Sequence, residues 1–281
     1  MRSVKMLMAA GAASLIASAA VAADMPIAPP PAYAPPPAED FGGWYLRGDI
    51  GFSNQQVKDL RYGRESAYSQ LTSFDQQTSF DSAGIYGLGV GYQFNPWLRA
   101  DLIGQYRGNS NFKGTDRFTG TASGFAYNGI DNYGASKSEW LVMANAYVDL
   151  GTWWCITPFV GAGVGAARVT MANFTDTGIN NIPFSTASFA SAPTASKWNL
   201  AWAIHTGLAY KVNPNLTLEL AYSYLNLGDG YTGSLSTFTG LTTNNSFKFK
   251  DITSHDVKFG VRWNLDAGPV YSEPPVLMRK G

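Results

Sequence analysis

The stretch Trp-Asn-Leu-Ala-Trp-Ala-Ile-His-Thr-Gly-Leu-Ala-Tyr-Lys-Val at residues 198–212 alternates large apolar side chains with small or polar ones. A period of two is the signature of a β-strand, whose successive side chains point to opposite faces. After Asn213-Pro214-Asn215 the alternation resumes, and apolar residues occupy every second position from Leu216 to Tyr224. These two stretches therefore predict adjacent antiparallel strands joined by a tight turn.

Six further stretches have the same pattern, which makes eight predicted strands in all. They begin at Trp44, Tyr86, Leu98, Trp140, Val160 and Val257. Each is close to the roughly 10 residues that a tilted strand needs to cross a bilayer. No apolar stretch is long enough for a transmembrane helix.

The connections between these strands alternate in length. Those at 95–96, 151–154 and 213–215 are short, whereas those at about 54–82, 108–138, 170–196 and 226–250 are long and rich in Ser, Thr, Asn and Gly. Long loops at one end and tight turns at the other are typical of outer-membrane barrels. The sequence thus predicts an all-β fold, an eight-stranded antiparallel up-and-down transmembrane β-barrel over 42–265.

A soluble barrel would have the same period with its apolar face inside. An eight-stranded barrel, however, has an interior just wide enough to be filled by side chains. The large apolar side chains of stretches such as Trp198–Ile204 would overfill it, whereas the other face carries Gly, Ala, Ser and Asn with some charges. We therefore expect the apolar face to contact lipid.

Composition excludes several classes of function. The chain has 20 Lys and Arg against 20 Asp and Glu, so nothing in its charge favours nucleic acid as a partner. A single Cys excludes a disulfide framework, and two His exclude a His-rich metal cluster. We accordingly expect no metal and no cofactor.

Both ends of the chain differ in composition from the barrel. Residues 1–23 fit a secretory signal peptide, because a basic start precedes an apolar Ala-rich stretch that ends in Ala20-Val21-Ala22. A membrane anchor is the alternative, which the short Ala-rich stretch disfavours. Residues 24–41 form a Pro-rich linker that we expect to be extended. An even number of strands places this linker and the tail 266–281 on the short-turn side, the periplasm.

The stretch Ile156-Thr157-Pro158-Phe159-Val160-Gly161-Ala162-Gly163-Val164-Gly165, which follows a strand ending at Gly151, resembles the small outer-membrane β-barrel surface proteins. That family includes opacity-type and immunogenic surface antigens, is often described as porin family, and is related in fold to the N-terminal barrel of OmpA. Gly43–Asp49 and Tyr86–Phe94 support the likeness over about 42–265. The resemblance implies a Gram-negative outer-membrane location and surface antigenicity. Family members usually end on an aromatic assembly signal, whereas here 18 residues follow Trp263.

Seven charged residues fall on the predicted interior face and form the main candidate site. They suit two interpretations, an ion-pair network that fills the barrel or the lining of a narrow pore. The network is favoured, because eight strands leave no continuous water channel and each buried charge needs an opposite partner. The residues are Arg47, Asp49, Arg99, Asp101, Glu219, Lys258 and Arg262.

His205, His255 and Cys155 are the remaining candidates for chemistry. His205 lies on the interior face near Lys211, Glu219 and Arg262, where it is either a hydrogen-bonded filler or a proton-sensitive gate or haem ligand. Ser254-His255-Asp256 cannot converge as a catalytic cluster, since neighbours in a strand point to opposite faces. Cys155, without a partner, is interpreted as a packing residue. We expect no catalytic residues.

The predicted loops are rich in aromatic residues. These contact a host, matrix or other ligand, or else pack together where the loops fold over the rim. They are Tyr62, Tyr68, Phe74, Phe112, Phe118, Tyr127, Phe174, Phe184, Tyr231 and Phe238.

The sequence as a whole predicts a non-enzymatic outer-membrane surface protein. Its expected role is structural, in envelope integrity, with antigenic or adhesive loops. The alternatives are a small-solute channel gated by interior ion pairs and, more remotely, a lipid-modifying enzyme. Expected partners are outer-membrane lipid and lipopolysaccharide, the barrel-assembly machinery, and host or matrix ligands of the loops.

Overall fold

The computed structural model describes residues 43–63, 70–122, 124–182, 185 and 187–265. The predicted signal peptide, linker and C-terminal tail lie outside these residues. The described residues form one antiparallel β-sheet of twelve strands, and they contain no helix long and apolar enough to span a membrane. The strands are β1 (Gly43–Gln56), β2 (Asp59–Tyr62), β3 (Leu71–Phe80), β4 (Ala83–Asn95), β5 (Leu98–Ala122), β6 (Phe125–Asp149), β7 (Ile156–Asn180), β8 (Ser188–Ala192), β9 (Ala195–Lys211), β10 (Leu216–Tyr231), β11 (Ser236–Thr237) and β12 (Phe247–Asn264).

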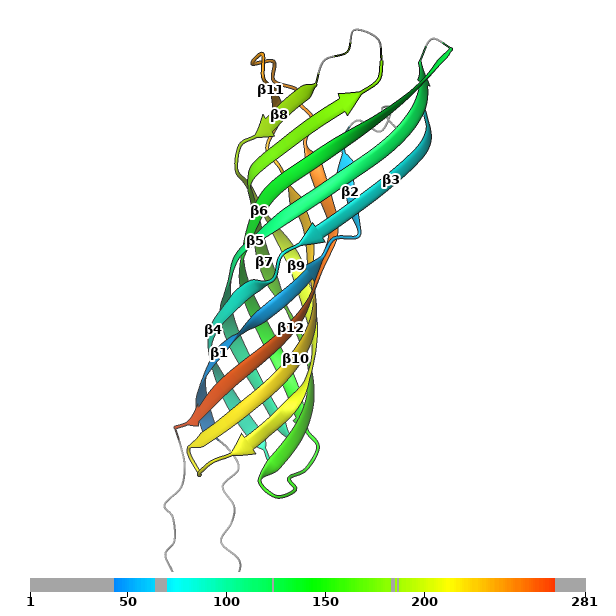
Figure 1. Cartoon of the computed structure of the whole chain (residues 1–281). Helices are drawn as coiled ribbons and strands as arrows, with labels where there is room; N and C mark the ends of the chain where they lie inside the picture. The colour runs from blue at the N-terminus through cyan, green and yellow to red at the C-terminus, as the bar shows by residue number, and fades with distance from the viewer. Residues whose placement is uncertain (1–42, 64–69, 123, 183–184, 186, 266–281) are drawn as a thin grey trace, which may run out of the picture. The chain divides into compact units, whose positions relative to one another are not determined.

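Eight of these strands close into a barrel, which confirms the predicted fold class (Figure 1). Their order around the ring is β1, β4, β5, β6, β7, β9, β10 and β12, and the last pairs with the first. At the closure Leu46 lies opposite Trp263, and on its other side opposite Val90. Closure leaves these eight strands without a free edge over their paired length, as the bilayer requires.

A band of apolar side chains covers the outside of the barrel. On β6 it runs from Trp140 to Val148, about the length that a tilted strand needs to span the hydrocarbon core. At one margin Tyr86, Tyr106 and Trp140 lie in register on neighbouring strands. At the other margin lie aromatic residues of four strands and two short turns: Trp44, Tyr92, Trp97, Trp153, Tyr210 and Trp263. Such girdles mark the two membrane–water interfaces.

The segments predicted as long loops at 108–138 and 170–196 are largely strand, which corrects the sequence prediction. β5 and β6 continue well beyond the apolar band, to Ala122 and from Phe125, and β7 continues to Asn180. With β2, β3, β8 and β11 they form a sheet extension at this end of the barrel (Figure 1). We call this the long-loop end, and the opposite end the short-turn end.

Irregularities in the strands separate the membrane band from the extension. The register shifts between Arg107 and Ser110 on β5, and near Asn173, Gly228 and Asp251 on β7, β10 and β12. The last three have positive φ, at 53°, 75° and 49°. Because each bulge inserts an extra residue, it changes which residues of the strand face inward. On β5 the buried positions are odd-numbered up to Arg107 and even-numbered from Ser110.

Above the bulges the outer face of the barrel wall becomes polar and the inner face becomes apolar. In the membrane band the outer face is apolar, whereas the inner face carries the buried charges together with a few apolar side chains such as Leu141 and Met143. In the extension the outer positions of β5 include Asn111, Lys113 and Thr115, whereas Phe112 points inward and is buried. The physical reason is the surrounding solvent, since lipid covers the band and water surrounds the extension.

Candidate functional site

The seven predicted interior residues all lie buried inside the barrel, at the level of the membrane band. Arg47 forms the hub of one group. Its guanidinium lies 3.0 Å from the carboxylate of Asp49, 2.8 Å from that of Asp101 and 3.3 Å from that of Glu219. It also donates a hydrogen bond to the Tyr147 hydroxyl over 2.9 Å.

Glu219 is the hub of a second, overlapping group. Besides Arg47 it faces Arg99 at 3.4 Å and Arg262 at 3.5 Å, and its side chain is 2% exposed. Arg99 extends the group to Asp149 at 3.2 Å. The Arg99 guanidinium also lies over the Tyr147 ring, 4.2 Å from its centroid, as in a cation–π contact.

The charges of this level are balanced in number. Four cationic side chains face four carboxylates, and the members are Arg47, Arg99, Lys258 and Arg262 against Asp49, Asp101, Asp149 and Glu219. Lys258 is buried but makes no ion pair within 4 Å in the part of the chain that the structure describes. We call this level the lower network.

A second charged level, nearer the long-loop end, is absent from the predicted site. Arg107 lies 3.0 Å from Glu139 and 2.6 Å from Asp256, and Lys137 is ion-paired with Glu139. Two cations again meet two carboxylates, and we call this level the upper network. The alternation already placed Arg107 and Asp256 on the polar face, but Lys137 and Glu139 lay in or beside a segment interpreted as loop.

The two histidines point to opposite sides of the wall. His205 is buried and hydrogen-bonded to Ser223 over 2.8 Å and to Asn145 over 3.1 Å, so both ring nitrogens are satisfied within the barrel. Lys211, expected beside it, is exposed instead. His255 faces outward and contacts the Tyr222 hydroxyl, whereas Ser254 and Asp256 face inward and contact Arg107. Ser254, His255 and Asp256 therefore do not converge.

Cys155 lies exposed in the turn before β7, with a φ of 67°. Its thiol forms no disulfide. It belongs to the short-turn end, away from both charged networks.

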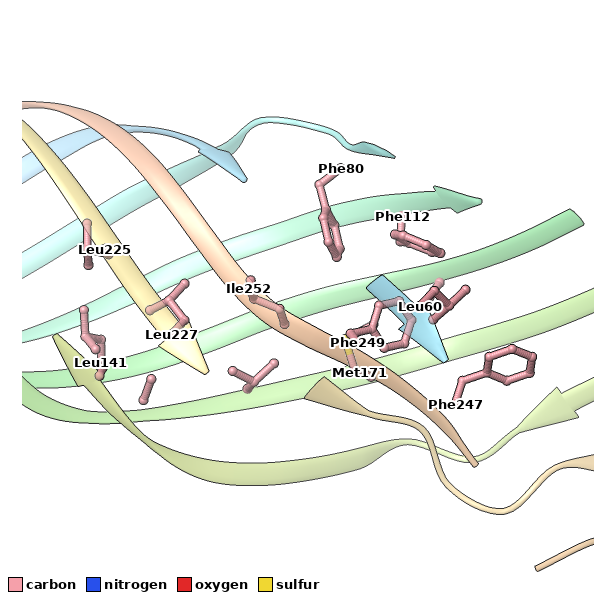
Figure 2. Close-up of a cluster of buried hydrophobic side chains, with 14 of the residues drawn as sticks. Leu60, Phe80, Phe112, Leu141, Met171, Leu225, Leu227, Phe247, Phe249 and Ile252 are labelled. Atoms are coloured by element: carbon pink, nitrogen blue, oxygen red, sulfur yellow. The ribbon is translucent and has the colours of Figure 1, made fainter. Parts of the chain in front are cut away.

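A hydrophobic cluster fills the barrel between the two charged levels and beyond the upper one, and the sequence did not predict it. Twenty-one buried residues form it, from Leu141 and Met143 in the membrane band up to Phe247 in the extension (Figure 2). The ring centroids of Phe112 and Phe249 lie 4.8 Å apart, and those of Phe174 and Phe247 lie 4.9 Å apart. We call this cluster the apolar plug.

The loop aromatics divide between the two interpretations. Phe112 and Phe174 are buried in the plug, as the packing interpretation expects. Phe238 is 87% exposed and Phe74 is 41% exposed, as a contact surface requires. Tyr62, Phe118 and Tyr127 line a cavity in the extension, and Tyr231 lies beneath the ammonium groups of two lysines. Tyr68 and Phe184 lie outside the described residues.

The chain belongs to the family described as outer membrane protein beta-barrel domain, whose pattern matches residues 9–264. It is therefore an outer-membrane β-barrel protein of the Gram-negative type, as the resemblance in the sequence implied.

The relatives of the chain include proteins of several bacteria. An uncharacterized protein of Brucella abortus is 33% identical over 229 residues, which cover 76% of this chain and 78% of the relative. A protein of Rickettsia bellii named as a putative adhesin is 29% identical over 226 residues, or 79% of this chain and 88% of the relative. Among solved structures, Neisserial surface protein A is 15% identical with a TM-score of 0.43, and the match covers 79% of this chain and 97% of that one.

Proposed function

We propose that this protein is a sealed outer-membrane barrel that displays its long-loop end at the cell surface and performs no catalysis. Both termini then lie in the periplasm, because an even number of strands returns the chain to the side from which it started. Its role is to anchor a surface-exposed sheet extension and to contribute to envelope integrity. The exposed tip makes adhesive or antigenic contacts with host or matrix ligands.

The filled interior is the observation that carries this proposal. A solute would have to pass the lower network, the upper network and the apolar plug, whose side chains lie both between the two networks and beyond the upper one. Balanced ion pairs hold the first two levels together, and moving one partner away would leave a buried charge uncompensated. Apart from the Tyr133 hydroxyl, which donates to Asp116, the side chains of the plug offer no strongly polar group to replace the hydration shell of an ion. Rearranging the ion pairs alone would therefore not open a channel.

The composition of the tip supports a contact role. Phe238 and Leu241 are 87% and 70% exposed around a turn at Gly240, next to strand β11. Exposed apolar side chains on the water-surrounded part of a protein commonly mark contact sites. The Rickettsia bellii relative named as a putative adhesin is consistent with this role.

The separation of the polar residues supports the absence of catalysis. A Ser-His-Asp arrangement needs its three side chains in one place. Here the wall of the barrel lies between His255 and the pair Ser254 and Asp256, and the Ser254 hydroxyl donates to Asp256 rather than meeting a base. The apolar band then makes the contacts with lipid and lipopolysaccharide, and the barrel-assembly machinery inserts the protein into the outer membrane.

Conductance of the full mature chain, refolded in a planar bilayer, tests the sealed interior. We expect no discrete openings from protein whose folding is verified by its heat-dependent gel mobility. Reproducible openings that Arg262→Gln alters would overturn the proposal in favour of a small-solute channel. A Leu220→Ala variant, altered on the lipid face of β10, serves as the matched control because it leaves the interior intact.

Surface display has its own test. A peptide epitope inserted after Gly240 should be accessible to antibody on intact cells, whereas one inserted after Pro214, in a short turn, should require permeabilised cells. The reverse pattern would refute the proposed orientation. Replacing both Phe238 and Leu241 by Ser should reduce attachment of expressing cells to host cells or matrix, and unchanged attachment would remove the adhesive role from this tip.

A further inference from the structure

The extension encloses a cavity of about 350 Å³ above the apolar plug. It is lined by residues of β2, β3, β5, β6, β7, β8 and β12, together with the segment around β11. Neither the proposed sealing of the barrel nor the exposed tip gives this cavity a role. Its lining combines carboxylates with aromatic rings.

Three carboxylates line this cavity, one from each of three adjacent strands. Asp116 on β5 lies directly opposite Asp131 on β6, and Asp176 on β7 lies opposite Tyr133, two residues farther along β6. The Tyr133 hydroxyl donates a hydrogen bond to Asp116 over 3.0 Å. Like charges directly opposite each other in a sheet are destabilising. The arrangement therefore disfavours the empty, ionised state of the cavity.

No cation of the described residues balances these carboxylates. None of the three forms an ion pair within 4 Å, and the charged groups that act on them are one another and Asp75 of β3. The lower and upper networks, by contrast, match every carboxylate with a cation in number. The cavity is thus the one level of the described interior with an excess of negative charge.

Asp116 provides a second, independent sign of a ligand. Its side chain is buried, with the residue only 3% exposed, and it lines the cavity. Its Oδ2 accepts the hydrogen bond from Tyr133, but its Oδ1 has no hydrogen-bond partner. A buried acceptor without a donor costs free energy, so a donor arriving from outside would be favoured there.

The electrostatics of the cavity agree with this geometry. Burial raises the pKa of Asp131 to about 6 and that of Asp176 to about 7, and it also raises the pKa of Asp116. Repulsion from Asp116 adds to the shifts of the other two, while the hydrogen bond from Tyr133 opposes part of the shift of Asp116. A bound cation would reverse these shifts, and by linkage it would bind more tightly as the carboxylates ionise.

Aromatic rings form the remaining walls. Phe118 and Tyr127 line the cavity from β5 and β6, and Phe247 lines it from β12. Gly129 makes room for the Phe118 ring, because a Cβ there would lie 2.4 Å from its Cζ atom. Ring faces attract cations, and they also pack against aliphatic carbon.

The combination selects one class of ligand. A bare metal ion needs several oxygen or nitrogen ligands around it, and the described residues contain no group of three such side chains in metal-binding geometry. An alkylammonium ion instead offers three N–H donors for carboxylates and an apolar stem for rings. A cavity of this volume is at the small end of the range for small-molecule sites.

We propose that this cavity binds an organic ammonium group, carried either by a small free amine or by a lysine side chain of a partner protein. The ammonium lies among the carboxylates of Asp116, Asp131 and Asp176, and its stem lies against Phe118 and Tyr127. The proposal deepens the proposed function by naming a ligand for the long-loop end, and it rests on that function only for the side of the membrane on which the cavity opens.

Calorimetric titration of the refolded full mature chain in detergent micelles tests the site. The probes are 1,5-diaminopentane and Nα-acetyl-lysine amide, and Nα,Nε-diacetyl-lysine amide serves as the neutral control probe. We expect one molecule of a charged probe to bind per chain, and the neutral probe to fail. Affinity should increase about tenfold from pH 5 to pH 8, as the carboxylates ionise. Stronger binding of diaminopentane assigns the site to free amines, and stronger binding of the lysine derivative assigns it to a protein partner.

Isosteric variants locate the binding in the cavity. D131N/D176N should lose at least about tenfold in affinity, because two charge-assisted hydrogen bonds disappear. This variant relieves repulsion between carboxylates and should stay folded, as its heat-dependent gel mobility will show. D251N is the matched control, since it removes an exposed carboxylate at the same end and should bind like the wild type.

Three results would overturn the proposal. They are the absence of binding by folded wild-type protein, equal binding by D131N/D176N, and equal binding of the neutral probe. Because the titration is made in micelles, its outcome does not depend on conductance or on the orientation in the membrane. A failure here is therefore distinguishable from a failure of the proposed function.

Discussion

Glu219→Gln is the sharpest test of the lower network, because this carboxylate faces three guanidinium groups. Arg47, Arg99 and Arg262 lie 3.3, 3.4 and 3.5 Å away, all at the ends of nearly buried side chains. The substitution preserves shape and removes one negative charge. It leaves four buried cations against three carboxylates.

The expected loss of stability is the difference between the attraction of Glu219 to the three guanidinium groups and the cost of burying its carboxylate. Each contact is worth about 5 kcal/mol of gross attraction at an effective dielectric constant of about 20, and the cost of burying the carboxylate offsets most of the sum. Glutamine keeps one acceptor oxygen for a guanidinium. Breaking a buried ion pair by removing one partner costs about 3–5 kcal/mol, and we expect Glu219→Gln to lower the free energy of unfolding by that amount.

The assay is urea unfolding of protein refolded into phospholipid vesicles, followed by the fluorescence of the eight tryptophans. The double variant E219Q/R262Q restores equal numbers of charges and should recover about half of the loss, as a double-mutant cycle will reveal. Asp59→Asn is the matched control, because its ion pair with Arg61 is exposed and should contribute less than about 1 kcal/mol. A loss below about 1 kcal/mol for E219Q, or no recovery in the double variant, would refute the reasoning.

Three further expectations concern other parts of the molecule. Phe249→Ala should lower the free energy of unfolding in urea by about 3–5 kcal/mol, because it empties the centre of the apolar plug, whereas exposed Phe238→Ala should change it by less than about 0.5 kcal/mol. Ile204→Arg, on the lipid face near the middle of the band, should cost about 2–4 kcal/mol in vesicles, and a neutral outcome would place the bilayer elsewhere. Because burial raises the pKa of Asp131 to about 6 and of Asp176 to about 7, the folded extension holds these protons more tightly than the unfolded chain. Without added amine its stability should fall as pH rises from about 4 to about 8, measured by amide hydrogen exchange after correction for intrinsic rates, and a rise would contradict the burial of these groups.

The interior of the extension also explains why the plug could not be predicted. On β5 the alternation continues past Arg107, and an uninterrupted period of two would turn Phe112 outward. The bulge before Ser110 turns it inward instead. The position of a bulge depends on the pairing of the flanking strands, on the boundary of the membrane and on the packing of the plug. The local sequence contains none of this information.

The sequence by itself determined the strands of the membrane band, their number and their facing. Large apolar residues at every second position, such as Trp198, Leu200 and Trp202, must contact lipid because an eight-stranded interior cannot hold them. The same alternation placed Arg47 and Glu219 on one face. Only the tertiary structure decided that these charges meet across the barrel, with Arg99 and Arg262 around one carboxylate. Closure of the ring brings together strands that are distant in the chain, and the bulges reverse the facing above the membrane, where water replaces lipid and the carboxylates of Asp116, Asp131 and Asp176 share one cavity.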